Sequence, residues 1–504
     1  MTQTIEDNYD DVPYEGQGFH QTHPDRIAVV ARLHGVDAPP VATARVLEIG
    51  CGPAGNLGPM AALLPDARFV GVDLSRRHVD LGQARLAAAG IANVELRHAN
   101  LVTLGDSLGA FDYVIAHGLY SWVPPDVAEE LLALVARSLS PNGVAYVSFN
   151  TLPGWYGRNV IRDLMRFHAE GETGVLSRVK RGREMLAWLR ETLPDGGRYA
   201  QPLVQEVSSL TKDTDYYIAH ELLCEDNHPI YFGELVARAA RHGLRYVDDA
   251  SPEITARHGT TALAKRARDT ADGDAVRAEQ YFDFLHGRTF RRALLCRAAV
   301  NVAADVQLAA AHTLRVASRL RPTGATTPDP KARGPVTFAS ERGELANEHP
   351  LTKAALLHLA SIAPLSLPFP ELVVAARARL GDEAASDRDV ELLRRFVVKS
   401  FLTTGGEAIE LRTVQPEAVA QPGEKPAVTA WAREESKRHT RVTSTRHEGV
   451  SLDDTLRLLV PLLDGTRTKE ELLAEWTRVK GRPFVPTAMN AALAMLAQKA
   501  LLVR

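Results

Sequence analysis

The chain has 504 residues, of which 45% are hydrophobic and 24% charged, and its formal net charge is −3. This length predicts about three domains of ~150 residues each, and the charge balance does not favour nucleic acid or an anionic membrane as a partner. The three cysteines (Cys51, Cys224 and Cys296) are far apart, which argues against a disulfide framework and a structural zinc site, so we expect no metal.

Strand and helix patterns alternate from residue 45 onward, after a first helix expected at 24–34. Apolar runs predict strands at 45–50, 68–72, 93–97, 111–116 and 143–149, and helical patterns fill 55–64, 75–89 and 126–139. Such a βαβ series is typical of an α/β fold in which a parallel sheet carries helices on both faces. The first strand is almost continuously apolar, as a strand buried on both sides requires.

The middle of the chain reads as mainly helical. Helices are expected at 156–169, 175–192, 230–242 and 276–320, and a short strand at 244–247 suggests a return to the sheet. A stretch rich in Pro, Thr and Gly then predicts a linker. Beyond it, two groups of three helices, each followed by a short strand, suggest tandem winged-helix units. We therefore divide the chain into 1–200, 201–320, the linker 321–338 and 339–504.

A glycine-rich turn at 50–55 follows the first strand and opens a helix. Glycine permits the dihedral angles of such a turn and lets backbone N–H groups approach a nucleotide-like ligand. The dinucleotide fingerprint is satisfied by the spacing of Gly50, Gly52 and Gly55, and Asp73 lies ~20 residues further on. The turn alone therefore fits NAD(P) and S-adenosylmethionine equally well.

Glu48, two residues before Gly50, separates the two cofactors. An acid at this strand end suits a ligand with a cationic amino group, such as the methionine part of S-adenosylmethionine, because the hydrogen bond is charge-assisted. Asp73 ends the second strand and is placed to accept bonds from ribose hydroxyls, and Asn100 follows the third strand near the adenine position. The expected cofactor-binding residues are Glu48, Gly50, Gly52, Gly55, Asn56, Asp73, Leu74, Asn100, Leu101 and His117.

Aromatic residues follow the fourth and fifth strands, where an acceptor would meet the methyl group. An amine acceptor must be neutral to attack, and desolvation among aromatic rings lowers the pKa of an amine. His117, Tyr120 and Trp122 are therefore the catalytic candidates, with His117 or Tyr120 relaying the proton. The substrate-binding candidates are Tyr14, Phe19, Tyr120, Trp122, Asn150 and Trp155. A structural histidine at 117 and core tryptophans at 122 and 155 are the competing interpretations.

The segment 45–150 resembles class I S-adenosylmethionine-dependent methyltransferases. LEIGCGPAG, VGVDLS and FDYVIAHG occur in the order and spacing of that family. Two positions depart from its pattern, because Ala54 stands where many members have glycine and Asn100 where aspartate is frequent. The resemblance implies a Rossmann-like sheet and S-adenosylmethionine as the cofactor.

A narrower resemblance covers most of the chain. The motifs at 8–14, 117–124 and 150–155 look like methyltransferases that carry a methyltransferase regulatory domain, here at about 205–300. Bacterial protein-lysine methyltransferases acting on outer-membrane proteins share this arrangement, including a mainly helical, winged-helix C-terminal domain. This implies methylation of lysine side chains, with a protein or peptide as the substrate. A small-molecule or peptide natural-product methyltransferase and a non-catalytic regulator are the alternatives.

The remaining expectations concern location and assembly. The polar first residues are unlike a signal peptide, and no apolar run approaches the ~20 residues of a membrane span. We therefore expect a cytoplasmic protein with no membrane span and no nucleic-acid partner, and a homodimer is one expected assembly. The sequence leaves the acceptor atom and the number of methyl groups open.

Overall fold

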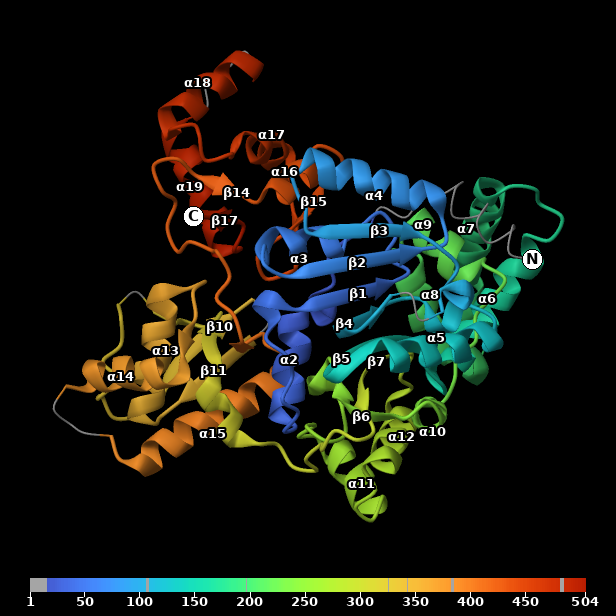
Figure 1. Cartoon of the computed structure of the whole chain (residues 1–504), viewed down its shortest axis with the longest axis horizontal. Coiled ribbons are helices and arrows are strands. Elements are labelled where there is room, and N and C mark those ends of the chain that lie inside the picture. The colour runs from blue at the N-terminus through green and yellow to red at the C-terminus, as the bar shows by residue number, and fades with distance from the viewer. Residues whose placement is uncertain are drawn as a thin grey trace.

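A central seven-stranded sheet organises the computed structural model, which describes residues 16–105, 108–195, 197–324, 326–341, 343–381, 385–480 and 485–504. The strand order is β3-β2-β1-β4-β5-β7-β6 (Figure 1). The strands are β1 (Arg45–Ile49), β2 (Arg68–Asp73), β3 (Val94–His98), β4 (Phe111–Ala116), β5 (Leu139–Asn150), β6 (Leu244–Asp249) and β7 (Phe290–Arg297). Strands β1 to β5 are parallel, whereas β7 runs antiparallel to both β5 and β6. The expected α/β sheet is thus confirmed.

Alternate residues of β1 enter two different cores, which explains its continuous apolar run. Val46 belongs to the core beneath α2 (Pro24–Leu33), α3 (Leu57–Leu63) and α4 (Arg76–Ala88). Leu47 and Ile49 belong to the core beneath α5 (Pro125–Ser138) and α10 (Phe232–Arg241). The sheet is therefore covered on both faces, as a parallel sheet requires.

The order of the parallel strands reverses between β1 and β4. Ligands of open α/β sheets bind outside the carboxyl ends of the strands at such a switch point. The turns after β1, β2 and β4, which begin at Gly50, Leu74 and His117, meet at this edge.

A helical excursion separates β5 from β6. It consists of α6 (Gly154–His168), α7 (Val175–Thr192), α8 (Gly197–Leu210), α9 (Asp215–Tyr217) and the π-helical turn η6 (Ile218–Leu222). These helices share a core of their own and gather at one end of the sheet (Figure 1). The chain then returns to the sheet through α10 and β6, which confirms the return expected at 244–247.

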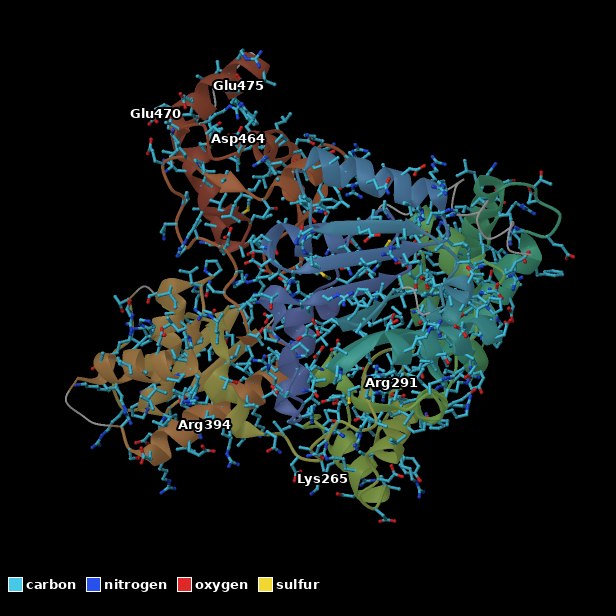
Figure 2. The ribbon with its side chains drawn as sticks, in the orientation of Figure 1. Lys265, Arg291, Arg394, Asp464, Glu470 and Glu475 are labelled. Atoms are coloured by element: carbon cyan, nitrogen blue, oxygen red, sulfur yellow. The ribbon has the colours of Figure 1, made fainter. Side chains whose placement is uncertain are left out.

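The continuous helix expected at 276–320 is wrong. The helix α12 (Ala275–His286) ends at Gly287, which adopts a left-handed φ of 59°. The strand β7 follows and is buried between β5 and β6. The sequence pattern did not indicate β7, because this strand contains charged residues. One of them, Arg291, is fully buried beside the helices (Figure 2).

The expected linker is also partly ordered into a sheet. Its first residues form β9 (Arg321–Pro322) and its last residues enter β10 (Val336–Ser340), which pairs with both β9 and β11 (Gly343–Asn347). The expected domain boundaries themselves stay predictions.

The C-terminal part forms two helical units. The first contains α13 (Pro350–Ile362), α14 (Phe369–Leu380) and α15 (Asp387–Thr404), with β8 (Arg315–Ser318), β12 (Leu367–Pro368) and β13 (Ile409–Arg412). Its core is continuous with that of α2. The second has a separate core and contains β14 (Ala427–Val428), α16 (Ala430–Ser436), β15 (Arg441–Thr443), β16 (Gly449–Ser451), α17 (Asp454–Leu459), α18 (Lys469–Lys480), α19 (Pro486–Gln498) and β17 (Leu502–Val503). The two expected groups of three helices thus correspond to α13, α14 and α15 in the first unit and to α17, α18 and α19 in the second.

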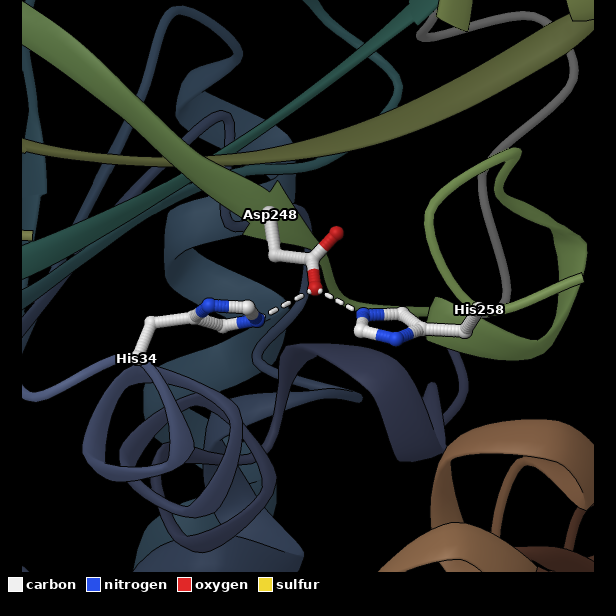
Figure 3. Close-up of side chains that lie close together, drawn as sticks. All are labelled: His34, Asp248 and His258. Atoms are coloured by element: carbon white, nitrogen blue, oxygen red, sulfur yellow. Dashed lines mark hydrogen bonds and ion pairs between the residues drawn. The ribbon is translucent and has the colours of Figure 1, made fainter. Parts of the chain in front are cut away.

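A buried polar cluster joins the end of α2 to β6. The Nε2 atoms of His34 and His258 lie 2.7 and 2.6 Å from the same oxygen of Asp248, Oδ2 (Figure 3). The other oxygen of Asp248 accepts the N–H of Asp249 at 2.8 Å. These are hydrogen-bond distances between two ring N–H donors and one shared acceptor. The cluster therefore serves as a buried connection between distant segments, and the sequence analysis missed it.

Within the described ranges, no helix has both the length and the apolar character needed to cross a membrane.

Candidate functional site

A cavity of about 1180 Å³ opens at the carboxyl edge of the sheet. Its walls come from the turns after β1 to β4, the segment around η6, the start of β7 and the second C-terminal unit. The expected site residues in its lining are Glu48, Gly50, Gly52, Asn56, Asp73, Leu74, Asn100, Leu101, His117, Phe19, Trp122 and Asn150.

Asp73 fastens the glycine turn to the end of β2. Its Oδ2 accepts the N–H of Gly52 at 2.8 Å, and its Oδ1 accepts the N–H of Ser75 at 2.9 Å. Gly50 and Gly52 adopt left-handed φ angles of 75° and 51°, which glycine tolerates without strain. Oδ1 also lies 3.4 Å from Nδ1 of His78, so the second lone pair of Oδ2 is the acceptor that remains for a hydroxyl group.

Gly55 lies where the N-terminal segment packs closely against the turn. It is absent from the cavity lining as the structure describes it, and a Cβ atom there would lie 2.3 Å from the carbonyl carbon of Gly16. Only a glycine allows the N-terminal segment to cross the turn this closely. Gly55 therefore allows the N-terminal segment to pack against the back of the turn, and its expected contact with the cofactor stays a prediction.

Glu48 brings an unsatisfied carboxylate to the cavity. Its Oε1 accepts the side-chain amide of Asn56 at 2.7 Å, whereas its buried Oε2 has no hydrogen-bond partner among the described residues. Burial raises the pKa of Glu48 to about 8, and the nearby Asp73 adds to the shift. A buried carboxylate oxygen is costly without a donor, so this position fits the cationic amino group of a ligand.

The residues present fit S-adenosylmethionine. Glu48 would hold its amino group, Asp73 its ribose hydroxyls, and Leu74, Asn100 and Leu101 would face its adenine ring. The Oδ1 atom of Asn100 accepts the N–H of Val102 at 3.0 Å, which fixes the side chain at the rim.

His117 lies between the cofactor side and the aromatic side of the cavity. Its Nδ1 is 3.0 Å from the hydroxyl of Tyr146 and 3.3 Å from that of Ser148. Burial, with the charge of Arg292, lowers the pKa of His117 to about 3. The ring therefore stays neutral near neutral pH and is a weak proton acceptor.

Two aromatic candidates are buried away from the cavity. Tyr120 is 1% exposed, packs against Phe149 and has its hydroxyl 3.4 Å from Nη1 of Arg238. Trp155 is equally buried and packs edge-on against Trp122, with ring centroids 6.0 Å apart. Both residues lie outside the cavity lining as the structure describes it, and their rings pack behind the cavity wall, so their direct contact with substrate stays a prediction. Tyr14 lies outside the described residues.

Several cavity residues were not expected from the sequence. They are Arg158, Thr214, Tyr216, Tyr217, Glu221, Thr289, Phe290, Arg292, Glu435, His439, Arg441 and Thr443. They come from segments far apart in the chain, and only folding brings them together. The aromatic pair at 216–217 was the one local signal that could have pointed to them.

The second C-terminal unit is joined to the cofactor side through Asn56. The Oδ1 atom of Asn56 accepts hydrogen bonds from the N–H of Phe19 at 3.1 Å, from the hydroxyl of Thr22 at 3.0 Å and from Nε2 of His447 at 2.7 Å. These donors fix the orientation of the Asn56 amide, so that its nitrogen faces Glu48. Trp431 packs against α3 at Gly58, where a Cβ would come within 2.5 Å of the indole.

Three parts of the chain match known protein families. The family described as a methyltransferase domain matches residues 46–143, a predicted methyltransferase regulatory domain matches 214–297, and the PKMT C-terminal winged helix domain matches 424–480.

Similar proteins cover almost the whole chain. An uncharacterized protein of Rickettsia prowazekii, RP789, is 30% identical over 490 residues, which is 94% of this chain and 86% of its own. The structure of PKMT2 from Rickettsia typhi in complex with AdoHcy matches with a TM-score of 0.87 and 26% identity, over 98% of this chain and 100% of that one. The chain therefore belongs to the family of RP789 and is a class I S-adenosylmethionine-dependent methyltransferase with a C-terminal winged-helix domain.

Proposed function

We propose that the enzyme methylates lysine side chains of a protein or peptide. One observation carries this proposal: a single cavity joins the acidic residues of the cofactor side to a wall of aromatic side chains. That wall contains Phe19, Trp122, Tyr216, Tyr217 and Phe290. The similarity to PKMT2 over its full length supports a protein acceptor.

The cofactor supplies a methyl group on a sulfonium when it is bound. Glu48 and Asp73 hold it in place, and the aromatic wall excludes water from the acceptor nitrogen. A lysine ammonium has a pKa of ~10.4 in water, and this pKa falls when the charged form is desolvated. Aromatic faces also attract the ammonium by cation–π contacts, worth about 0.5–2 kcal/mol each.

We assign His117 to orientation of the cavity wall through Tyr146 and Ser148, because its lowered pKa makes it a weak base. Trp122 stays a candidate for substrate contact, since its side chain lines the cavity, and Asn150 supports the same wall through its bond of 2.9 Å to Asn227.

The proposal is tested with S-adenosylmethionine labelled in its methyl group and a lysate of the host. We expect the label on lysine side chains of protein, located by mass spectrometry. Asp73→Ala is the matched control and should abolish the transfer. Label found only in small molecules would favour a small-molecule methyltransferase, and no binding of S-adenosylhomocysteine at millimolar concentration would favour a non-catalytic regulator.

The cytoplasmic location, the homodimer and the lack of a nucleic-acid partner remain proposals. So does the division into units at residues 200, 320 and 338. Sedimentation of the purified protein would test the homodimer directly.

A further inference from the structure

The cavity is also lined by a carboxylate from the helical excursion between β5 and β6, which none of the sequence motifs includes. Glu221 lines the cavity from η6, a π-helical turn that follows α9. Within the described part of the chain, no hydrogen bond or ion pair joins its carboxylate to another residue. Single π turns often mark functional sites, because the extra residue shifts side chains out of helical register.

The nearest cation is already engaged elsewhere. Arg158 donates from Nε to Glu206 at 2.5 Å and from Nη1 to the hydroxyl of Tyr217 at 3.1 Å. Its guanidinium also lies 5.3 Å from the ring centroid of Trp155. Arg158 thus builds the wall around Glu221 without neutralising it at close range.

The surroundings of Glu221 favour a cationic ligand. Burial raises the pKa of its carboxyl to about 8, because the charge of Arg158 only partly compensates and that of Asp213 opposes ionisation. Tyr216 and Tyr217 come directly before η6 and line the same cavity, as does Trp122. A carboxylate next to aromatic rings matches an ammonium group on an alkyl stem, since the rings contact the methylenes and the carboxylate pairs with the charge.

We propose that Glu221, with Tyr216, Tyr217 and Trp122, forms the binding site for the ammonium group of the acceptor lysine. This inference rests on the proposed function and names the residue that selects its substrate. In this arrangement Glu48 pairs with the amino group of the cofactor and Glu221 with the ammonium group of the acceptor.

The same carboxylate completes the proton balance. The acceptor ammonium gives one proton to the Glu221 carboxylate, which leaves a lone pair on the lysine nitrogen. This lone pair forms the new N–CH₃ bond as the S–CH₃ bond breaks, and the electron pair of the broken bond stays on sulfur. Glu221 afterwards releases the proton to solvent, and no other reactant is needed.

The test compares two isosteric variants. Glu221→Gln removes the charge within the cavity, and Glu225→Gln removes the same charge from an exposed position nearby that lies outside the cavity lining. The probes are two peptide libraries with random flanks, one with a central lysine and the other with norleucine, which has the same stem without the ammonium. Binding to the S-adenosylhomocysteine complex and methylation of the lysine library are both measured.

We expect wild type and Glu225→Gln to bind the lysine library at least tenfold more tightly than the norleucine library. Glu221→Gln should lose this preference and lower kcat/KM at least tenfold, with unchanged affinity for S-adenosylhomocysteine. If wild type methylates lysine and Glu221→Gln retains both the preference and the rate, the Glu221 site is refuted while the function stands. If wild type methylates no lysine peptide or protein, the proposed function fails and this inference fails with it.

Discussion

The raised pKa of Glu48 couples cofactor binding to pH. Because burial holds the pKa of this carboxyl at about 8 in the protein alone, most molecules carry it protonated at pH 6.5. A cationic amino group prefers the ionised form, so binding releases a proton. We expect the dissociation constant of S-adenosylhomocysteine to fall by up to about tenfold for each unit by which the pH rises toward 8, measured by calorimetry.

Glu48→Gln removes this coupling. The variant keeps the acceptor for Asn56 but loses the charge, so we expect binding weaker by about 10- to 100-fold, as for a lost charge-assisted bond of 1.5–3 kcal/mol. Its affinity should also stay flat between pH 6.5 and 8. The other titratable groups beside Glu48 are Asp73 and Cys51. Burial raises the pKa of the Cys51 thiol, so this thiol stays protonated. A retained pH slope in Glu48→Gln would place the titrating group elsewhere.

Asp248 is expected to contribute strongly to stability. Burial alone would raise the pKa of this carboxyl, but the charges and hydrogen bonds of His258 and His34 outweigh it and hold the pKa well below its usual range. A lowered folded-state pKa stabilises the fold above the unfolded pKa of ~3.9, and this contribution is lost as the pH falls toward the folded value.

Asp248→Asn should therefore lower the free energy of unfolding by about 3 kcal/mol at pH 7. The difference from wild type should shrink below pH ~4. Urea unfolding at pH 7 and below pH ~4 measures the difference in unfolding free energy between the variant and wild type. The exposed Asp269→Asn is the control. Equal stability of Asp248→Asn and wild type at pH 7 would contradict a structural role of the cluster.

At the level of elements, one arginine fixes α12 against β7. Arg291 is fully buried and contacts Asp283 with Nε and Nη2, both at 2.8 Å, and Glu279 with Nη2 at 2.9 Å. Its guanidinium also lies 4.0 Å from the ring centroid of Phe232 on α10. Removing it would leave Glu279 without its cation and Asp283 with only Arg288, whose Nη1 lies 3.6 Å from Oδ1.

We expect Arg291→Met to destabilise the protein by about 4 kcal/mol, because breaking a buried ion pair costs more than the pair itself contributes. Thermal unfolding measures the effect, and Arg266→Met on the exposed side of α11 (Ala262–Thr270) is the matched control. A similar midpoint in both variants would show that the helix is held by apolar packing alone.

This arginine also explains where the sequence analysis failed on the fold. Strands β1, β2, β4 and β5 were predictable because each contains an apolar run between turn signals, which reflects burial, whereas the polar edge strand β3 was expected from the alternation of strands and helices. β7 carries three arginines, and its burial depends on acids from α12 that follow no strand periodicity. The antiparallel pairing of β7 with β5 and β6 depends on tertiary contacts, and the local sequence pattern of residues 276–320 did not indicate it.

At the level of the whole molecule, the site also contains residues that the sequence pattern indicates and residues that it does not. Glu48, Gly52 and Asp73 were predictable, because β1, the glycine turn, α3 and β2 form one βαβ unit that brings them together. Glu221, Arg292 and Thr443 were not, since each reaches the cavity from a segment more than 100 residues away from that unit. The C-terminal winged-helix unit was expected as a separate domain, yet it forms part of the cofactor cavity.

The contact between His447 and Asn56 makes cofactor affinity depend on this C-terminal unit. His447 is 1% exposed and adopts a left-handed φ of 60°, so the turn presents its ring to Asn56 with little freedom. His447→Asn suits the test, because asparagine tolerates this backbone conformation and is too short to reach Asn56. The exposed His312→Asn is the matched control.

Losing this bond should weaken S-adenosylhomocysteine binding about fivefold, as expected for ~1 kcal/mol. The effect should vanish in the Glu48→Gln background, since Asn56 acts on the ligand only by orienting Glu48. Calorimetry on the two single variants and the double variant gives the coupling free energy between His447 and Glu48. Additive losses would mean that the C-terminal unit affects the cofactor by another route, such as the Trp431 contact with α3.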